Sequence, residues 1–174
     1  MEETPYEIER KFLIRMPDLD WLSSVASRSH IVQTYLLREH KETSERVRSR
    51  TDEHRTVFTH TKKTRVTAVR RIEIEEEINR TEYETLLQRA DPKRSPIEKD
   101  RYCLPANGLV YEIDVFPFWK EQAFLEIELG DESQTFPWPE GIVCIREVTN
   151  DGRYTNSALA LQIPDEELQK EEIT

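Results

Sequence analysis

Apolar and polar side chains alternate with a period of two along most of this chain, a pattern typical of β-strands with one apolar and one polar face. Asp, Asn, Gly or Pro residues interrupt the alternation at intervals, and Asn107-Gly108 between two alternating runs is a strong hairpin signal. The pattern predicts nine strands, at residues 6–14, 31–38, 45–51, 55–63, 70–78, 97–104, 109–116, 123–129 and 143–148.

Short helical patterns interrupt the strands. Asp18 is a suitable N-cap for a helix whose next apolar residues share one face. The run Thr81-Glu82-Tyr83-Glu84 reads as a capping box for a second helix, which Pro92 ends. Residues 156–161 predict a third helix, and residues 165–174 predict a frayed acidic one. Many antiparallel strands with few helices predict a closed barrel or a sandwich.

The length of 174 residues fits one domain, which we expect at 1–164, followed by an acidic tail at 165–174. The net charge of −10 argues against broad binding of nucleic acids or anionic membranes. No apolar run approaches the length of a membrane span, and the N-terminus lacks a signal-peptide pattern. We therefore expect a soluble, cytoplasmic protein.

Cysteine and histidine usage limits the metal chemistry. The two cysteines, Cys103 and Cys144, form no C-x-x-C or Cys/His cluster, and the four histidines show no metal-ligand spacing. Any bound metal should therefore have oxygen ligands, which favours Mg²⁺ or Mn²⁺.

The polar faces of several expected strands carry charge of nearly one sign. Three guanidinium groups share a face within residues 46–50, whereas carboxylates share a face at Glu112 and Asp114 and again at Glu126 and Glu128. Other charged rows are Glu7, Glu9 and Lys11; Arg71, Glu73, Glu75 and Glu77; and Lys99 and Arg101.

For any single strand, the simpler interpretation is a polar face in water. Like charges along one strand repel each other, however, unless opposite charge lies between them. A triphosphate with divalent cations would satisfy both sets of rows, because the cations bind carboxylates and the phosphate oxygens bind guanidinium and ammonium groups. The rows therefore predict a barrel with a charged lumen and with apolar side chains packed outward, under helices or a partner.

The segment Glu7-Ile8-Glu9-Arg10-Lys11 resembles the E-x-E-x-K signature of the CYTH family, also called triphosphate tunnel metalloenzymes. Further segments resemble the motifs of this family in the same order, and the match covers the chain up to Ile163. These segments are residues 33–36, 46–48, 61–63, 71–75, 98–102, 112–116, 125–128 and 148–156.

The resemblance implies an eight-stranded antiparallel β-barrel, a tunnel whose charged lumen holds a triphosphate and divalent metal. The metal ligands that it implies are Glu7, Glu9, Glu73, Glu75, Asp114, Glu126 and Glu128. The triphosphate-binding residues that it implies are Lys11, Arg46, Arg48, Lys63, Arg71, Lys99, Arg101 and Arg153. Among these, we expect Glu7, Glu9, Lys11 and Lys99 to be catalytic.

One position is ambiguous, because either Lys62 or Lys63 could face the tunnel. The T-x-K spacing favours Lys63, and Lys62 would then point outward. We interpret Arg50 and Glu77 as residues of the tunnel mouth.

The charge of a triphosphate repels a nucleophile, so cations must neutralise it before water attacks. Our hypothesis is that one metal bridges the phosphates and a second activates the water. Inorganic tripolyphosphate is the leading substrate, since no aromatic cluster on the charged strands builds a base pocket. Alternatives are an activity similar to class IV adenylate cyclases, a thiamine triphosphatase, and a non-catalytic polyphosphate- or nucleotide-binding module. The expected partner is a small-molecule triphosphate, and a homodimer is an open alternative.

Overall fold

The computed structural model describes residues 6–67 and 70–167, with side chains from residue 8 onward. Each of the nine expected strands is present. Their bounds are β1 (Tyr6–Arg15), β2 (Ser27–Tyr35), β3 (Thr43–Thr51), β4 (Thr56–Arg65), β5 (Arg70–Ile78), β6 (Ile97–Ala106), β7 (Leu109–Val115), β8 (Gln122–Leu129) and β9 (Cys144–Glu147). The helical elements are α1 (Leu19–Val25), α2 (Arg80–Leu87), the 3-10 turn η1 (Gly152–Tyr154) and α3 (Asn156–Leu159).

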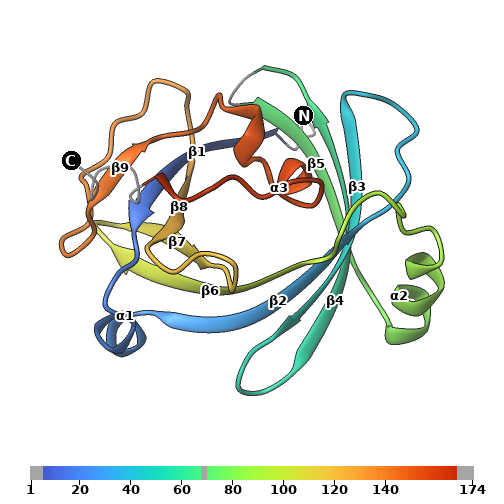
Figure 1. Cartoon of the computed structure of the whole chain (residues 1–174), viewed down its shortest axis with the longest axis horizontal. Coiled ribbons are helices and arrows are strands. Elements are labelled where there is room, and N and C mark those ends of the chain that lie inside the picture. The colour runs from blue at the N-terminus through green and yellow to red at the C-terminus, as the bar shows by residue number, and fades with distance from the viewer. Residues whose placement is uncertain (1–5, 68–69, 168–174) are drawn as a thin grey trace.

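Eight of the strands form a closed antiparallel ring, which Figure 1 shows end-on. Neighbours follow the order β5-β4-β3-β2-β6-β7-β8-β1, and a further pairing of β5 with β1 closes the circle. The expected fold class, an eight-stranded antiparallel barrel with few helices, is therefore confirmed. No helix in the described part of the chain is long and apolar enough to cross a membrane.

A pairing between β1 and β5 closes the ring. Among the described residues, it joins Tyr6 with Ile72, Glu7 with Arg71 and Ile8 with Arg70. Farther along the same strand, residues 12–14 of β1 pair instead with β9. On its other side, β1 pairs with β8 over eight residues. One edge of β1 is thus shared between β5 and β9.

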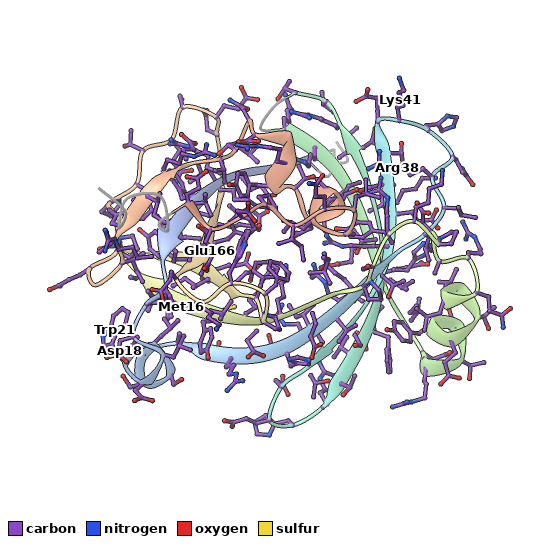
Figure 2. The ribbon with its side chains drawn as sticks, viewed as in Figure 1. Met16, Asp18, Trp21, Arg38, Lys41 and Glu166 are labelled. Atoms are coloured by element: carbon purple, nitrogen blue, oxygen red, sulfur yellow. The ribbon has the colours of Figure 1, made fainter. Side chains whose placement is uncertain are left out.

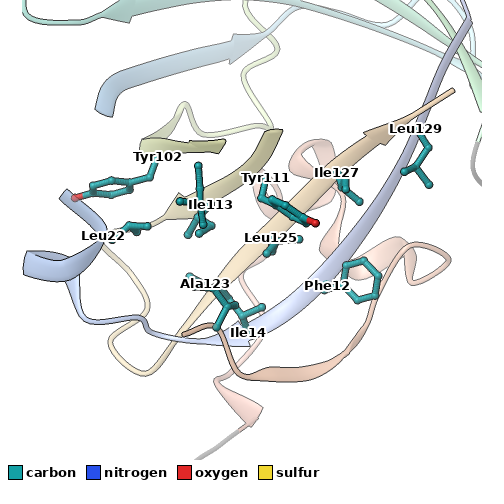
Figure 3. Close-up of a cluster of buried hydrophobic side chains, with 12 residues drawn as sticks. Phe12, Ile14, Leu22, Tyr102, Tyr111, Ile113, Ala123, Leu125, Ile127 and Leu129 are labelled. Carbon is teal, nitrogen blue, oxygen red and sulfur yellow. The ribbon is translucent and has the colours of Figure 1, made fainter. Parts of the chain in front are cut away.

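Apolar side chains on the outer faces of β1, β7 and β8 form the main core, shown in Figure 3. Phe12, Tyr111 and Leu125 belong to this cluster, together with Leu22 from α1. The segment that carries Phe136 and Trp138 packs against it. The expectation that apolar side chains point outward under covering elements is correct for this part of the ring.

A second core cluster occupies the inner face at one end of the ring. Leu13 contributes from β1, Phe116 from just after β7 and Phe124 from β8. Trp119 and Tyr154 pack on them. Because period-two alternation places these residues on the same face as the charged rows, the lumen is apolar at this end and charged beyond it.

The helix boundaries bear out one sequence prediction and correct another. Asp18 caps α1 by accepting hydrogen bonds from the backbone N–H groups of Asp20 and Trp21. The predicted capping box at Thr81 is wrong, because the N-cap of α2 is Asn79, two residues earlier, which accepts from the N–H of Glu82. Asparagine is a better N-cap than threonine, which accounts for the earlier start of α2.

Strand β2 also differs from its predicted range. It begins at Ser27 because residues 27–30 pair with β6, and it ends at Tyr35, after which Leu36 makes only an isolated bridge to Ala90. In the predicted tail helix, Asp165 and Glu166 are not helical, and residues 168–174 lie outside the described residues.

Candidate active site in the charged lumen

Two adjoining cavities lie inside the ring, with volumes of about 540 and 460 Å³. They share Glu9, Arg46, Lys63 and Asn156 in their walls, so they form one interior space. We call the larger one the mixed cavity and the other the cationic cavity. The mixed cavity is lined by Glu9, Arg46, Arg48, Arg50, Lys63, Glu73, Glu75, Arg101, Glu112, Glu126, Glu128 and Asn156.

The two cavities differ in charge. Six carboxylates and five cationic side chains line the mixed cavity. In the cationic cavity seven basic residues face only two acidic ones, Glu9 and Glu42. Those basic residues are Lys11, Arg38, Lys41, Arg46, Lys63, Arg65 and Arg71. The interior therefore offers cation ligands in one part and an excess of anion-binding groups in the other.

Asp114 is the centre of a buried ion-pair network. Its carboxylate is fully buried and accepts from Lys99 Nζ at 2.8 Å and from Arg101 Nε and Nη2 at 2.8 and 3.0 Å. Arg101 also pairs with Glu112 at 2.6 Å and lies 3.8 Å from Glu126. Both oxygens of Asp114 are thus occupied by protein cations.

Two buried cations in or beside this network have lowered pKa values, and burial is the largest cause in each. Burial, opposed by Asp114 and reinforced by Arg101, lowers the pKa of Lys99 to about 7. Burial and then repulsion from Arg46 and Arg101 lower the pKa of Arg48 to about 9. An anion placed between these groups would favour their charged forms.

Arg46 and Arg48 carry buried donors that no protein group satisfies. Both side chains are buried on β3, and the Nε atom of each has no hydrogen-bond partner in the described part of the protein. Arg48 makes one side-chain hydrogen bond, from Nη2 to Gln33 Oε1 at 3.2 Å. A buried unsatisfied guanidinium N–H is costly, which makes these two atoms strong indicators of an oxyanion ligand.

Lys11 lies where the charged lumen meets its apolar end. Its Nζ atom donates to the carbonyl of Tyr154 at 3.1 Å and sits 4.7 Å from the centre of the Phe124 ring. It also lies 3.1 Å from Glu126 Oε1, but without hydrogen-bond geometry, so that buried oxygen has no hydrogen-bond partner in the described residues. A carboxylate oxygen that accepts no hydrogen bond fits a metal ligand.

Most of the residues predicted for the site come together in the lumen. Lys63 lines both cavities, 3.7 Å from Glu73, whereas Lys62 is exposed, so the T-x-K spacing identified the inward lysine. Arg71 lines the cationic cavity. Glu75 lines the mixed cavity and accepts from Thr61 Oγ1 at 2.9 Å.

Two predicted residues stand apart. Arg153 lines neither interior cavity; its side chain is 65% exposed and is held by Asp151 at 2.8 Å. Glu7 pairs with Arg71 through the backbone, but its side chain lies outside the described residues. In the described part of the chain, no three His, Cys, Asp or Glu side chains converge as a ready-made metal site.

Sequence reasoning missed uncharged members of the site. Tyr35 lines the cationic cavity, and its hydroxyl accepts from Gln33 Nε2 at 3.0 Å. Gln33 in turn accepts from Arg48. These residues alternate on one face of β2, so period-two counting could have found them, but the sequence prediction rested on charged residues alone.

Known proteins resemble this chain in sequence and in fold. A family model described as the CYTH domain matches residues 5–137. An inorganic triphosphatase of Acetivibrio thermocellus is 36% identical over 154 residues, which is 88% of this chain and 92% of that protein. An inorganic triphosphatase of Nitrosomonas europaea is 39% identical over 102 residues, covering 54% of this chain and 62% of the other. A crystal structure of an inorganic triphosphatase aligns with 95% of this chain and 99% of its own, with a TM-score of 0.58 and 31% identity.

Proposed function

The chain belongs to the CYTH domain family, and from this premise we propose that it hydrolyses inorganic tripolyphosphate with Mg²⁺ or Mn²⁺. The observation that carries the proposal is the pair of buried, unsatisfied guanidinium donors of Arg46 and Arg48 beside a row of inward carboxylates. This combination suits a polyanion that enters together with its counter-cations. The inorganic triphosphatase relatives support the same substrate class.

The inward carboxylates of β1 and β8 are the proposed cation ligands. We assign Glu9, Glu126 and Glu128 as metal ligands, since all three line the mixed cavity and Glu9 pairs with Glu128 across the two strands. Glu73 and Glu75 face the same cavity as further ligands. A bound divalent cation supplies charge neutralisation and lowers the pKa of a coordinated water. Asp114 accepts hydrogen bonds from Lys99 and Arg101, so we assign it to positioning these two side chains and not to metal binding.

The basic side chains hold the phosphate oxygens. Arg46 and Arg48 bind through their unsatisfied N–H groups, while Lys11, Lys63 and Arg101 neutralise charge from neighbouring strands. These positions are fixed before the substrate arrives, so little reorganisation is needed as charge shifts to the departing phosphate. With no described nucleophilic Ser, Cys or His lining the mixed cavity, water is the attacking group.

A substrate panel tests the proposed function. Phosphate release from tripolyphosphate, ATP and thiamine triphosphate is measured with Mg²⁺, Mn²⁺ or EDTA. We expect tripolyphosphate to give the highest kcat/KM, and EDTA to abolish turnover. Formation of cyclic AMP as the main product would assign a cyclase instead. Binding of tripolyphosphate without phosphate release would assign a non-catalytic binding protein.

Replacing Arg48 with methionine is expected to raise KM for tripolyphosphate by about 10- to 100-fold, because a charge-assisted hydrogen bond contributes about 1.5–3 kcal/mol. Methionine keeps most of the buried volume and removes the donors. Steady-state kinetics with saturating metal measures the change. The matched control is Lys62→Met, which removes an exposed cation from the neighbouring strand β4 and should leave KM unchanged. If Arg48→Met had the KM of the wild-type protein, Arg48 would not be part of the binding site.

A further inference from the structure

Two guanidinium groups converge on one serine hydroxyl at the rim of the cationic cavity. Arg38 Nη2 and Arg94 Nη1 each donate to Ser157 Oγ at 2.6 Å, and Arg94 also donates to the Ser157 carbonyl. The three residues come from separate segments: Arg38 follows β2, Arg94 precedes β6, and Ser157 lies in α3. The tertiary fold brings these residues together, because they are far apart in the sequence and share no local turn.

The positive charge at this rim is poorly compensated. Arg94 has one acidic partner, Asp91, at 3.3 Å. Neither Arg38 nor Lys41 makes an ion pair with any described carboxylate. Both residues lie on the connection from β2 to β3, at the same side of the ring (Figure 2). Burial and then the proximity of Arg94 lower the pKa of Arg38, against smaller opposing contributions from Tyr35 and Asp91.

The hydrogen-bond inventory of Ser157 indicates what is missing. A serine hydroxyl has two acceptor lone pairs and one hydrogen to donate. The two arginines use both lone pairs, so the hydrogen remains for an additional acceptor. A neutral oxygen is also a weak counterpart for two cations, whereas a tetrahedral oxyanion would accept from both guanidinium forks and from the hydroxyl.

We propose that Arg38, Arg94 and Ser157 form a rim site that binds a phosphate group without a divalent cation. The ligand is inorganic phosphate, at the opening through which the hydrolysis product would leave. The contrast with the mixed cavity follows from charge. In the mixed cavity six carboxylates offset five cationic side chains, so a bound divalent cation would favour an anion there. At the rim, Asp91 is the only described carboxylate that pairs with Arg38 or Arg94.

The test measures binding of inorganic phosphate by calorimetry or phosphorus NMR, with EDTA present throughout. The wild-type protein should bind phosphate, and Arg38→Gln should weaken the affinity at least tenfold. The charge-matched control is Arg28→Gln, which removes an arginine on the outer face that pairs with Asp100. That variant should bind phosphate as the wild type does. If both variants lost phosphate affinity equally, the loss would be explained by the change in net charge, and the proposal would be overturned.

A second variant places a negative side chain of the protein itself in the rim site. Ser157→Asp places a carboxylate between the two guanidinium groups, so phosphate binding should be lost while the melting temperature is kept or raised. Unchanged phosphate binding in this variant, or no binding by the wild type, overturns the proposal. Because these measurements contain neither triphosphate nor divalent metal, their outcome is independent of whether the protein hydrolyses tripolyphosphate.

Discussion

Replacing Asp114 with alanine is expected to lower the free energy of unfolding by about 3–5 kcal/mol, because the change leaves buried cations without their counter-ion. Lys99 is fully buried, and Arg101 loses both hydrogen bonds to this carboxylate. Urea denaturation measures the loss. The control is Asp100→Ala on the same region of sheet, where the lost pairs with Arg28 and His30 are exposed and should cost at most about 1 kcal/mol. Equal losses for the two variants would show that the buried network does not stabilise the ring.

The same carboxylate should also set the acid limit of stability. Burial alone would raise the pKa of Asp114, but Arg101 and Lys99 hold it well below its ordinary value. The unfolded chain therefore binds this proton at a higher pH than the native protein does. The contribution of Asp114 is fully present above its unfolded pKa of about 4 and is lost as the pH falls below it. Unfolding curves measured from about pH 5 down to about pH 3 should show this loss in the wild type and a smaller one in Asp114→Ala.

Replacing Glu9 with glutamine is expected to lower metal-dependent turnover of tripolyphosphate by on the order of 100-fold or more, since even residues that only orient metal ligands contribute 10–100-fold. Glu9 lines both cavities, and glutamine keeps its size while removing the charge that binds a cation. The measurement is kcat over a range of Mg²⁺ concentrations, with circular dichroism to verify folding.

The matched control is Glu76→Gln, which changes a carboxylate that is 70% exposed on the neighbouring strand β5 and that lines neither cavity. It should keep wild-type turnover. Wild-type turnover in Glu9→Gln would remove Glu9 from the reaction, whereas partial recovery at high Mg²⁺ would support its assignment as a metal ligand.

Alternation along the chain was sufficient to predict the strands, and the like-sign charge of the rows predicted their inward direction. The prediction worked because the opposite faces are strongly apolar and find covers in α1 and in the segment around Trp138. Closure of the ring was not readable from periodicity, since the pairing of β1 with β5 joins residues about sixty positions apart. The choice of a barrel over a sandwich came from the charged rows and from the family resemblance.

The roles of individual residues depended on contacts that a linear pattern does not contain. Asp114 lies in an acidic row, yet the strand register brings Arg101 directly opposite, so its oxygens meet cations before any metal. Arg153 belongs to a segment that resembles a family motif. Its guanidinium group donates hydrogen bonds to Asp151, two residues earlier, and this contact holds it outside the lumen. The convergence of Arg38 and Arg94 on Ser157 joins three segments and had no sequence signal.

The division of the β1 edge between two partners has a mechanical consequence. Residues 6–8 of β1 pair with β5, and residues 12–14 pair with β9. A widening of the ring that parts β5 from β1 would therefore leave the second half of β1 held between β8 and β9. Arg71 and Glu9 lie on the two strands of this seam and line the cationic cavity, so such a widening would change the distance between them.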